Sequence, residues 1–143
     1  MTRLLTAYTD GACRGGNPGI CSCAWVLYDS GKLVTSDSHY LGPERHTNNY
    51  AEYQGLIRLL KYLYQNNIRN VIIHSDSELV VNQTLGKWAT NLESTRLFSA
   101  QAYGLLIQGC HMLKHVKGHE GTEGNEEADR LCNFVLDTNE GEL

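Results

Sequence analysis

The amino-acid sequence predicts an α/β fold with a five-stranded mixed sheet, in which three antiparallel strands come first, parallel strands follow, and helices lie on both faces. Three observations support this prediction. Three strand-like segments precede the first helical pattern, a short apolar run follows that pattern, and one more strand-like segment separates two later helical patterns. Strands that alternate with helices are typical of parallel pairing with helices packed on the sheet.

Three strands are expected before any helix. Residues 4–9 form a short apolar run that ends at Asp10-Gly11, and a glycine-rich loop over 15–19 follows it. Residues 21–28 are apolar and aromatic, and a turn at 29–31 leads into residues 32–41, whose polar side chains are typical of an edge strand. These segments predict an antiparallel meander.

The period of the sequence changes to that of a helix over residues 49–66. Apolar side chains recur there at steps of three or four residues, as on one face of an amphipathic helix. Residues 70–75 are too short for a helix and contain the continuous apolar run 71–73, which predicts a strand buried on both faces at the centre of the sheet. The remaining elements are predicted as helices over 77–85 and 92–107, a strand over 110–116, and a closing helix over 124–136.

The composition predicts one globular domain over residues 1–143, because 41% of the residues are hydrophobic and 20% are charged. No stretch reaches the roughly 18 consecutive apolar residues of a membrane span, and the first residues lack the length of a signal peptide. We therefore expect a cytoplasmic protein with no membrane partner. The net charge of −4 argues against binding nucleic acid by bulk electrostatics, so any such contact must be local.

The five cysteines are expected to have structural roles. Cys21 and Cys23 alternate along a predicted strand, so their side chains face the same side and suit a core pair. The cysteines lack the two spaced pairs that a zinc site needs.

Four acidic residues each have an ordinary structural explanation. Asp10 with the glycine after it is a common turn pair, and Glu52 has the spacing of a capping box. Asp76 suits the N-cap of the helix that follows it, and Asp129 suits a solvated helix face. Taken singly, these explanations remain open.

Taken together, the acidic residues point to a metal site. If the first strand and the strand after the first helix are parallel neighbours, Asp10 and Asp76 open into one crevice, and Glu52 stands at the start of the helix between them. Ionised carboxylates in one crevice raise one another's pKa unless a cation compensates them, and oxygen ligands suit Mg²⁺ or Mn²⁺. Two such ions about 4 Å apart can clamp the attacking and leaving oxygens of a phosphoryl displacement.

A histidine follows the last predicted strand. His119 lies in a loop flanked by Gly118 and Gly121, and a histidine in a mobile loop near phosphate can move a proton or assist product departure. The alternative is an exposed loop histidine without a role.

Four ordered segments resemble those of the type 1 ribonuclease H family, along nearly the whole chain. They are residues 8–13 with 16–19, residues 47–52, residues 75–77, and residues 116–119 followed by 124–129. His119 and Asp129 stand ten positions apart, as they do in that family. The resemblance implies a ribonuclease H-like fold and hydrolysis of the RNA strand of an RNA–DNA hybrid, which leaves 5′-phosphate and 3′-hydroxyl ends.

The resemblance also implies a set of site residues. Asp10 would bridge two Mg²⁺ ions, for which Mn²⁺ is a substitute, and Glu52, Asp76 and Asp129 would complete the cage, with His119 in its mobile loop. Six residues would contact the hybrid. Minor-groove contacts to 2′-hydroxyls and base edges would come from Asn17, Asn48 and Asn49. A phosphate of the DNA strand would be held by Arg45, Thr47 and Asn91.

The sequence departs from some members of that family. Residues 86–91 pass almost directly to the next helix, where those members carry a basic, tryptophan-rich protrusion. We therefore expect weak, salt-sensitive binding. Trp88 suits either stacking on the substrate or a place in the core, and Glu78 adds negative charge near the metals. The chain begins almost at its first strand and ends soon after its last helix, so we expect a bare catalytic domain, working as a monomer or beside a replication or reverse-transcription partner.

Two other functions are compatible with the predicted fold. A DNA-directed nuclease of the integrase or resolvase type shares the fold. The reading of 2′-hydroxyls, which only RNA carries, is suited to Asn17, Asn48 and Asn49, and this argues against a DNA-directed nuclease. A non-catalytic hybrid-binding module would have been favoured by loss of one carboxylate, and all four are present.

Overall fold

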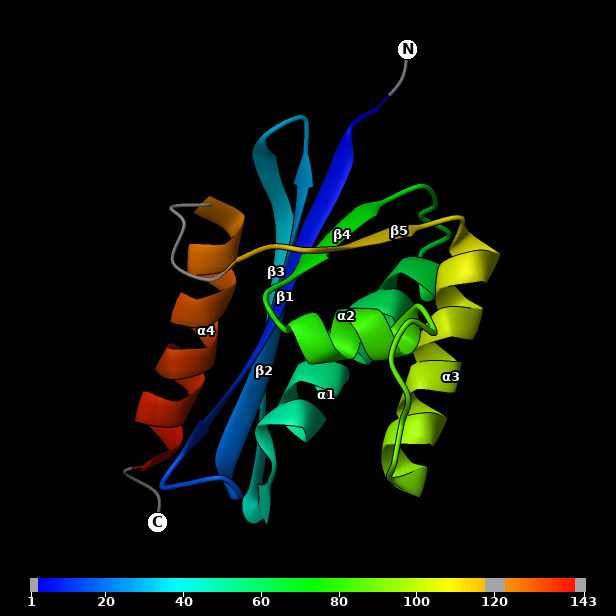
Figure 1. Cartoon of the computed structure of the whole chain (residues 1–143). Coiled ribbons are helices and arrows are strands. Elements are labelled where there is room, and N and C mark those ends of the chain that lie inside the picture. Colours follow the sequence, from blue (N-terminus) through cyan, green and yellow to red (C-terminus); the bar gives the residue numbers. More distant parts are fainter. Residues whose placement is uncertain (1–2, 118–122, 141–143) are drawn as a thin grey trace.

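Nine elements follow one another in the order βββαβααβα within residues 3–117 and 123–140, which the computed structural model describes (Figure 1). The strands are β1 (Leu5–Arg14), β2 (Gly19–Asp29), β3 (Lys32–His46), β4 (Ile72–Ser75) and β5 (Met112–His115). The helices are α1 (Asn48–Gln65), α2 (Glu78–Thr84), α3 (Glu93–Gly109) and α4 (Glu123–Glu140). The predicted order of elements is confirmed.

The strands form one mixed sheet in the order β3-β2-β1-β4-β5. β1 pairs antiparallel with β2, and β2 with β3, whereas β4 is parallel to both β1 and β5. The predicted five-stranded mixed sheet is therefore confirmed. The prediction that the run 70–75 marks the centre of the sheet is wrong, because β1 is the central strand.

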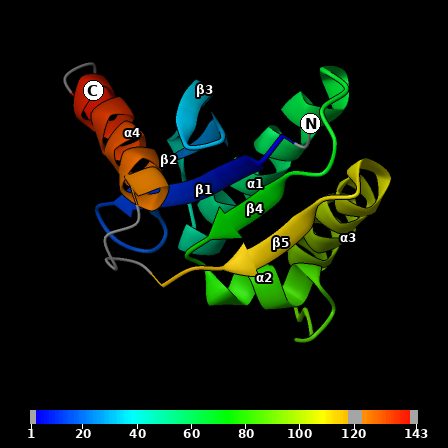
Figure 2. The same ribbon diagram turned by 90° about the horizontal axis from the view of Figure 1, so that it is seen from above.

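β4 is buried on one face only. Val71 and Ile73 are fully buried, but Ile72 and His74 are partly exposed. α4 packs on β1, β2 and β3, and in the described part of the chain no helix covers the same face of β4 (Figure 2). An unbroken apolar run thus does not require two covered faces.

β1 continues beyond Asp10-Gly11 as far as Arg14, so the expected strand end at Asp10 is wrong. The antiparallel ladder with β2 runs from Leu5 opposite Asp29 to Arg14 opposite Ile20, and it holds the turn-prone pair in extended form. β3 likewise extends to His46, past the predicted end at residue 41.

Two glycines let α1 approach β1 closely. A Cβ atom at Gly11 would lie 2.5 Å from the backbone of Ala51 and Glu52, and one at Gly55 would lie 2.7 Å from the carbonyl oxygen of Asp10. Only glycine fits such an approach of two backbones. The first turns of α1 therefore lie directly beside the acidic residue of β1.

Helices pack on both faces of the sheet, as predicted. The apolar face of α1 joins β1, β2 and β4 and the inner face of α3 in the main core, whose largest fully buried side chains include Tyr53, Leu56, Leu59, Leu60, Leu63 and Ile73. On the other face α4 buries Ala128, Cys132 and Leu136. Burying apolar area of this kind is the main favourable contribution to folding.

The cysteines differ from the expectation in one respect. Cys21 and Cys23 are both buried, as their alternation predicts, but Cys21 is bonded to Cys13 in a disulfide across β1 and β2. Cys23, Cys110 and Cys132 are free thiols.

Two further features bear on the expectations. Trp88 is 44% exposed, so the alternative of a core position for this side chain is wrong. Across the helices of residues 3–117 and 123–140, none combines the length and the apolar character needed to cross a membrane.

Candidate active site

Parallel pairing brings Asp10 and Asp76 together. Thr9 of β1 lies opposite Ser75 of β4 in a parallel ladder. Asp10 follows Thr9 and Asp76 follows Ser75, so the two carboxylates lie close together at the carboxyl end of β4. Asp10 is 4% exposed, and the N–H of Gly11 donates to its Oδ1 over 2.9 Å. Asp76 is partly buried.

Glu52 reaches the same place from α1. The N-cap of this helix is Thr47, whose hydroxyl oxygen accepts from the N–H of Tyr50 at 3.1 Å. Glu52 therefore stands in the second turn and forms no capping box. Its Oε1 accepts from the N–H of Gly11 at 3.1 Å, and its Oε2 is buried with no hydrogen-bond partner among the described residues.

Asp76 is also not needed as a cap. The N-cap of α2 is Ser77, whose hydroxyl oxygen accepts from the N–H of Val80 at 3.2 Å. The ordinary structural explanations for Glu52 and Asp76 are thus not the ones that the structure shows.

Three carboxylates form one cluster. One carboxylate oxygen from each of Asp10, Glu52 and Asp76 lies within 4.8 Å of the other two. They line a cavity of about 190 Å³, to which Gly11, Asn125, Glu126 and Asp129 also contribute. Asp129 is exposed on α4 and stands in the wall of this cavity, outside the three-residue cluster.

The environment of the cluster disfavours the ionised form of its carboxyl groups. Burial raises the pKa of Asp10 to about 8, and the charges of Asp76 and Asp129 add to this shift. Burial likewise raises the pKa of Glu52 well above its usual value, with the charges of Asp10 and Asp76 adding to it. The pKa of Asp76 is raised by burial and by Asp129.

A bound cation would relieve this repulsion and favour the ionised carboxylates. The donor set consists of oxygen atoms only, and the unpartnered Oε2 of Glu52 is free to act as a ligand. Hard divalent cations bind such sets. The residues therefore fit a divalent metal ion.

Asn125 is a site residue that the sequence analysis did not single out. Its side chain is 6% exposed and lines the acidic cavity, and its Oδ1 has no hydrogen-bond partner within the part of the chain described. Its spacing in the sequence could have indicated this position, because Asn125 precedes Asp129 by one helical turn and so shares its helix face.

The expected substrate residues line a separate groove of about 370 Å³. Asn17, Arg45, Thr47 and Asn49 lie around it. Asn48 is exposed beside them, and its backbone N–H donates to Oδ1 of Asn17 at 2.9 Å. The structure therefore gathers five of the six predicted contacts at one place.

Two of the expected residues are not placed in these sites. Asn91 is exposed before α3 and does not line the described groove, whose α3 side is instead built by Leu92, Ser94, Thr95 and Phe98. His119 lies outside the residues that the structure describes.

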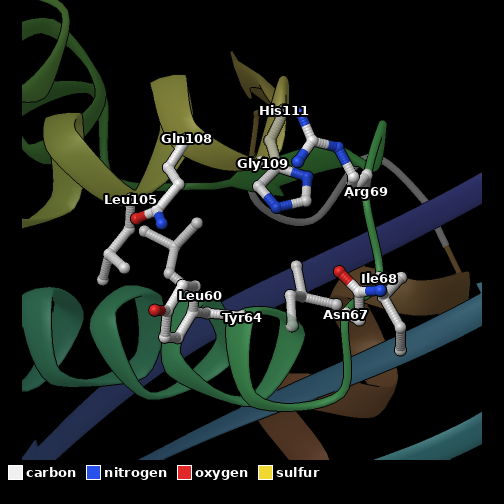
Figure 3. A pocket seen from close by; sticks show the side chains of 10 residues that line it. Leu60, Tyr64, Asn67, Ile68, Arg69, Leu105, Gln108, Gly109 and His111 are labelled. Carbon is white, nitrogen blue, oxygen red and sulfur yellow. The ribbon is translucent and has the colours of Figure 1, made fainter.

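Another cavity, of about 140 Å³, lies at the opposite end of the parallel strands (Figure 3). Side chains from the ends of α1 and α3 and from the segment before β4 surround it, with Arg69 and His111 as its basic groups. Because its described lining contains no carboxylate, it does not share the chemistry of the acidic cluster.

Comparison with known proteins gives consistent matches. The family model described as RNase H matches residues 2–136. The chain is 37% identical over 133 residues to ribonuclease HI of Halobacterium salinarum, in a match that covers 92% of this chain and 63% of that relative, so the chain spans less than two thirds of that relative's length. It is 36% identical over 144 residues to ribonuclease H of Francisella philomiragia, covering 92% of this chain and 90% of that protein.

Solved structures of similar proteins share the fold. The crystal structure of RNase H1 from Halobacterium salinarum matches with a TM-score of 0.83 at 36% identity, covering 94% of this chain and 98% of that one. The structure of LC11-RNase H1 in complex with an RNA/DNA hybrid matches with a TM-score of 0.81 at 30% identity, covering 94% and 97%.

Proposed function

The chain belongs to the ribonuclease H family, and we propose that it is an endoribonuclease that hydrolyses the RNA strand of RNA–DNA hybrids and leaves 5′-phosphate and 3′-hydroxyl ends. The observation that carries this proposal is the meeting of Asp10, Glu52 and Asp76, whose oxygens lie within 4.8 Å of one another at the edge of the sheet. A similar protein, LC11-RNase H1, has been solved with such a hybrid.

The proposed cofactor is Mg²⁺, bound as two ions, with Mn²⁺ as a substitute. Asp10 lies within 4.8 Å of both Glu52 and Asp76 and would serve as the bridging ligand, while Glu52, Asp76 and Asp129 would complete the cage. When bound, the ions supply a water of lowered pKa and compensate the charge that develops on the phosphate oxygens.

The chain's own residues would position the substrate. Asn17, Asn48 and Asn49 present amide groups that suit 2′-hydroxyls and base edges in the minor groove. Arg45 and Thr47 offer a guanidinium and a hydroxyl for a phosphate of the DNA strand, with the remaining predicted contact, Asn91, just outside the groove.

Two residues would complete the reaction. Asn125 can donate its amide N–H toward a phosphate oxygen while its unpartnered Oδ1 accepts from a water in the acidic cavity. His119 would accept or donate the proton exchanged at the leaving oxygen.

The proposed setting is a single catalytic domain over residues 1–143 that acts as a monomer in the cytoplasm. One continuous sheet with helices on both faces supports the single domain. A replication or reverse-transcription complex is the proposed place for any protein partner.

The test is cleavage of an end-labelled RNA–DNA hybrid, beside duplex RNA, duplex DNA and single strands, with Mg²⁺, with Mn²⁺ and with a chelator. We expect cutting of the RNA in the hybrid only, dependent on metal and lost in Asp10→Asn. Binding of the hybrid without cutting would contradict the proposal and favour a scaffold. Cutting of duplex DNA would contradict it in favour of an integrase or resolvase activity.

A further inference from the structure

The disulfide between Cys13 and Cys21 closes the loop that carries Asn17. Cys13 lies near the end of β1 and Cys21 near the start of β2, and the two residues are directly opposite each other in the ladder. The loop between them, residues 15–18, is exposed. The disulfide is therefore a covalent tie at the base of a substrate-contact loop.

The same sulfur atoms also contact the other wall of the groove. Sγ of Cys21 lies 3.2 Å from the carbonyl oxygen of His46, and Sγ of Cys13 lies 3.7 Å from that oxygen. His46 is the last residue of β3, directly before Thr47, the N-cap of α1. The disulfide thus sits where the loop, β3 and the first turn of α1 meet.

The ladders of β2 with β1 and β3 hold the ends of the loop, at Arg14 opposite Ile20 and at Gly19 opposite His46. Among the described residues, the loop tip itself is held to this wall by exposed hydrogen bonds. Arg45 donates from Nη1 to the carbonyl oxygens of Gly15, at 3.1 Å, and Pro18, at 3.2 Å, and the N–H of Asn48 donates to Asn17. Water competes with exposed hydrogen bonds, so each contributes little to the order of the loop. The covalent tie therefore adds to the two ladders at the base of the loop, and the position of Asn17 depends on both.

We propose that Cys13 and Cys21 form a thiol–disulfide site through which a dithiol reductant weakens binding of the hybrid. Cys13 is partly exposed and Cys21 is fully buried, so a thiolate of the reductant attacks Sγ of Cys13. The S–S bond breaks, Cys21 leaves as a thiolate and takes a proton, and a mixed disulfide forms on Cys13. The second thiol of the reductant then closes its own disulfide and releases Cys13 as a thiol, which completes a transfer of two electrons and two protons.

Reduction should act on binding rather than on the chemical step. The two sulfur atoms must separate to van der Waals contact, roughly 3.5–4 Å, and the loop gains freedom that binding must remove again. Asp10 is paired with β2, and the neighbouring Thr9 is paired with β4. Because reduction breaks neither pairing, the acidic cluster keeps its geometry. This inference rests on the proposed function for its kinetic readout. We expect KM for the hybrid to rise about two- to tenfold with kcat unchanged within twofold.

The experiment compares oxidised protein with protein reduced by dithiothreitol, in a background where Cys23, Cys110 and Cys132 are replaced by alanine. Alkylation and mass spectrometry establish the state of the remaining pair. Steady-state cleavage gives kcat and KM, and anisotropy of a labelled hybrid gives the affinity of the Asp10→Asn variant, which reports binding without cleavage. Cys13→Ser combined with Cys21→Ser should behave as the reduced protein under both conditions.

Three results would overturn the proposal: both cysteines alkylated in the protein purified without reductant, an affinity unchanged by complete reduction, or a loss of kcat with KM constant. Hydrogen exchange of the amides of residues 14–20 provides a readout that needs no substrate, and it should quicken on reduction. If exchange quickens but neither form binds or cuts the hybrid, the proposed function fails and the coupling to binding fails with it. If the hybrid is cut equally by both forms, the proposed function stands and the thiol–disulfide site alone is wrong.

Discussion

The backbone N–H of Gly11 donates to the carboxylate of Glu52, with 3.1 Å between Gly11 N and Glu52 Oε1. This bond joins β1 to the second turn of α1 at the residue after Asp10. The bond can form because Gly11 has no side chain. A Cβ at that position would lie 2.5 Å from the backbone of α1. The acidic cluster therefore depends on a close approach of two backbones.

Gly11→Ala should push α1 away from β1 and separate Glu52 from Asp10. We expect a loss of about 1–3 kcal/mol in the free energy of unfolding, as for overpacking in a core, together with at least a tenfold loss of activity. Urea unfolding and hybrid cleavage measure the two effects. The matched control is Gly104→Ala in α3, where a Cβ meets nothing within 4 Å, and there alanine should stabilise the helix by about 0.5–1 kcal/mol. Equal behaviour of the two variants would contradict the close-approach argument.

The stability of the metal-free protein should fall as pH rises. The pKa of Asp10 is raised from its ordinary 3.8 to about 8 in the folded protein, so the folded state keeps protons that the unfolded state has released. Between these two values the free energy of unfolding therefore decreases with increasing pH. Asp10→Asn should remove this cost and raise the free energy of unfolding at pH 8 by at least about 1 kcal/mol.

Urea unfolding in chelator at pH 5.5 and pH 8 tests this expectation. Glu44→Gln, at an exposed position of β3, is the matched control and should leave the pH dependence unchanged. Adding Mg²⁺ at pH 8 should stabilise the wild type and not Asp10→Asn, because ions that bind only the folded state stabilise it. A stability that rises with pH in chelator would show that the cluster is not strained by its own charge.

Asn125→Ala should lower kcat without destabilising the protein. Its buried Oδ1 has no partner within the described residues, so the folded protein gains little from the amide, whereas the proposed reaction uses it. We expect about a tenfold loss of kcat, as for removal of a positioning hydrogen bond, and a change in unfolding free energy below about 1 kcal/mol. Glu126→Gln, on the exposed rim of the same cavity, is the control with kcat retained. Loss of stability in proportion to activity would mark Asn125 as merely structural.

Binding of the hybrid should weaken steeply with salt. The net charge is −4, so attraction to phosphate depends on a few local cations such as Arg45 in the groove. We expect KM to rise between 50 and 200 mM salt, and Arg45→Gln to reduce the salt slope by about one. Lys32→Gln, at the far end of β3 from the groove, should leave the slope unchanged. A KM independent of salt would contradict local electrostatic binding.

Much of this fold could be read from side-chain periodicity. The steps of three and four residues in α1 come from burial on one face, and burial also decides the fold, so pattern and structure agree there. The end of β1 could not be read, because Asp10-Gly11 is a turn pair by local preference and is overruled by the ladder with β2.

The site shows the same division. The meeting of Asp10 with Asp76 follows from parallel pairing, which the order of elements already implies. The Cys13–Cys21 bond depends on strand register, which no single residue reveals. The contact at Asn91 was inferred from the family resemblance over a segment that matches it loosely, and in the structure Ser94 and Thr95 line the groove while Asn91 does not.

The parallel pairing of β1 with β4 has a consequence for how the protein acquires its activity. Asp10 lies in β1 and Asp76 directly follows β4, with β2, β3 and α1 between them along the chain, so no fragment that ends before Asp76 brings the two together. Closing so long a loop costs conformational entropy, which slows folding. The contact between Asp10 and Asp76 therefore forms only with the sheet as a whole. During synthesis the nuclease centre would thus remain unassembled until β4 has left the ribosome, which keeps incomplete chains from cutting nucleic acid.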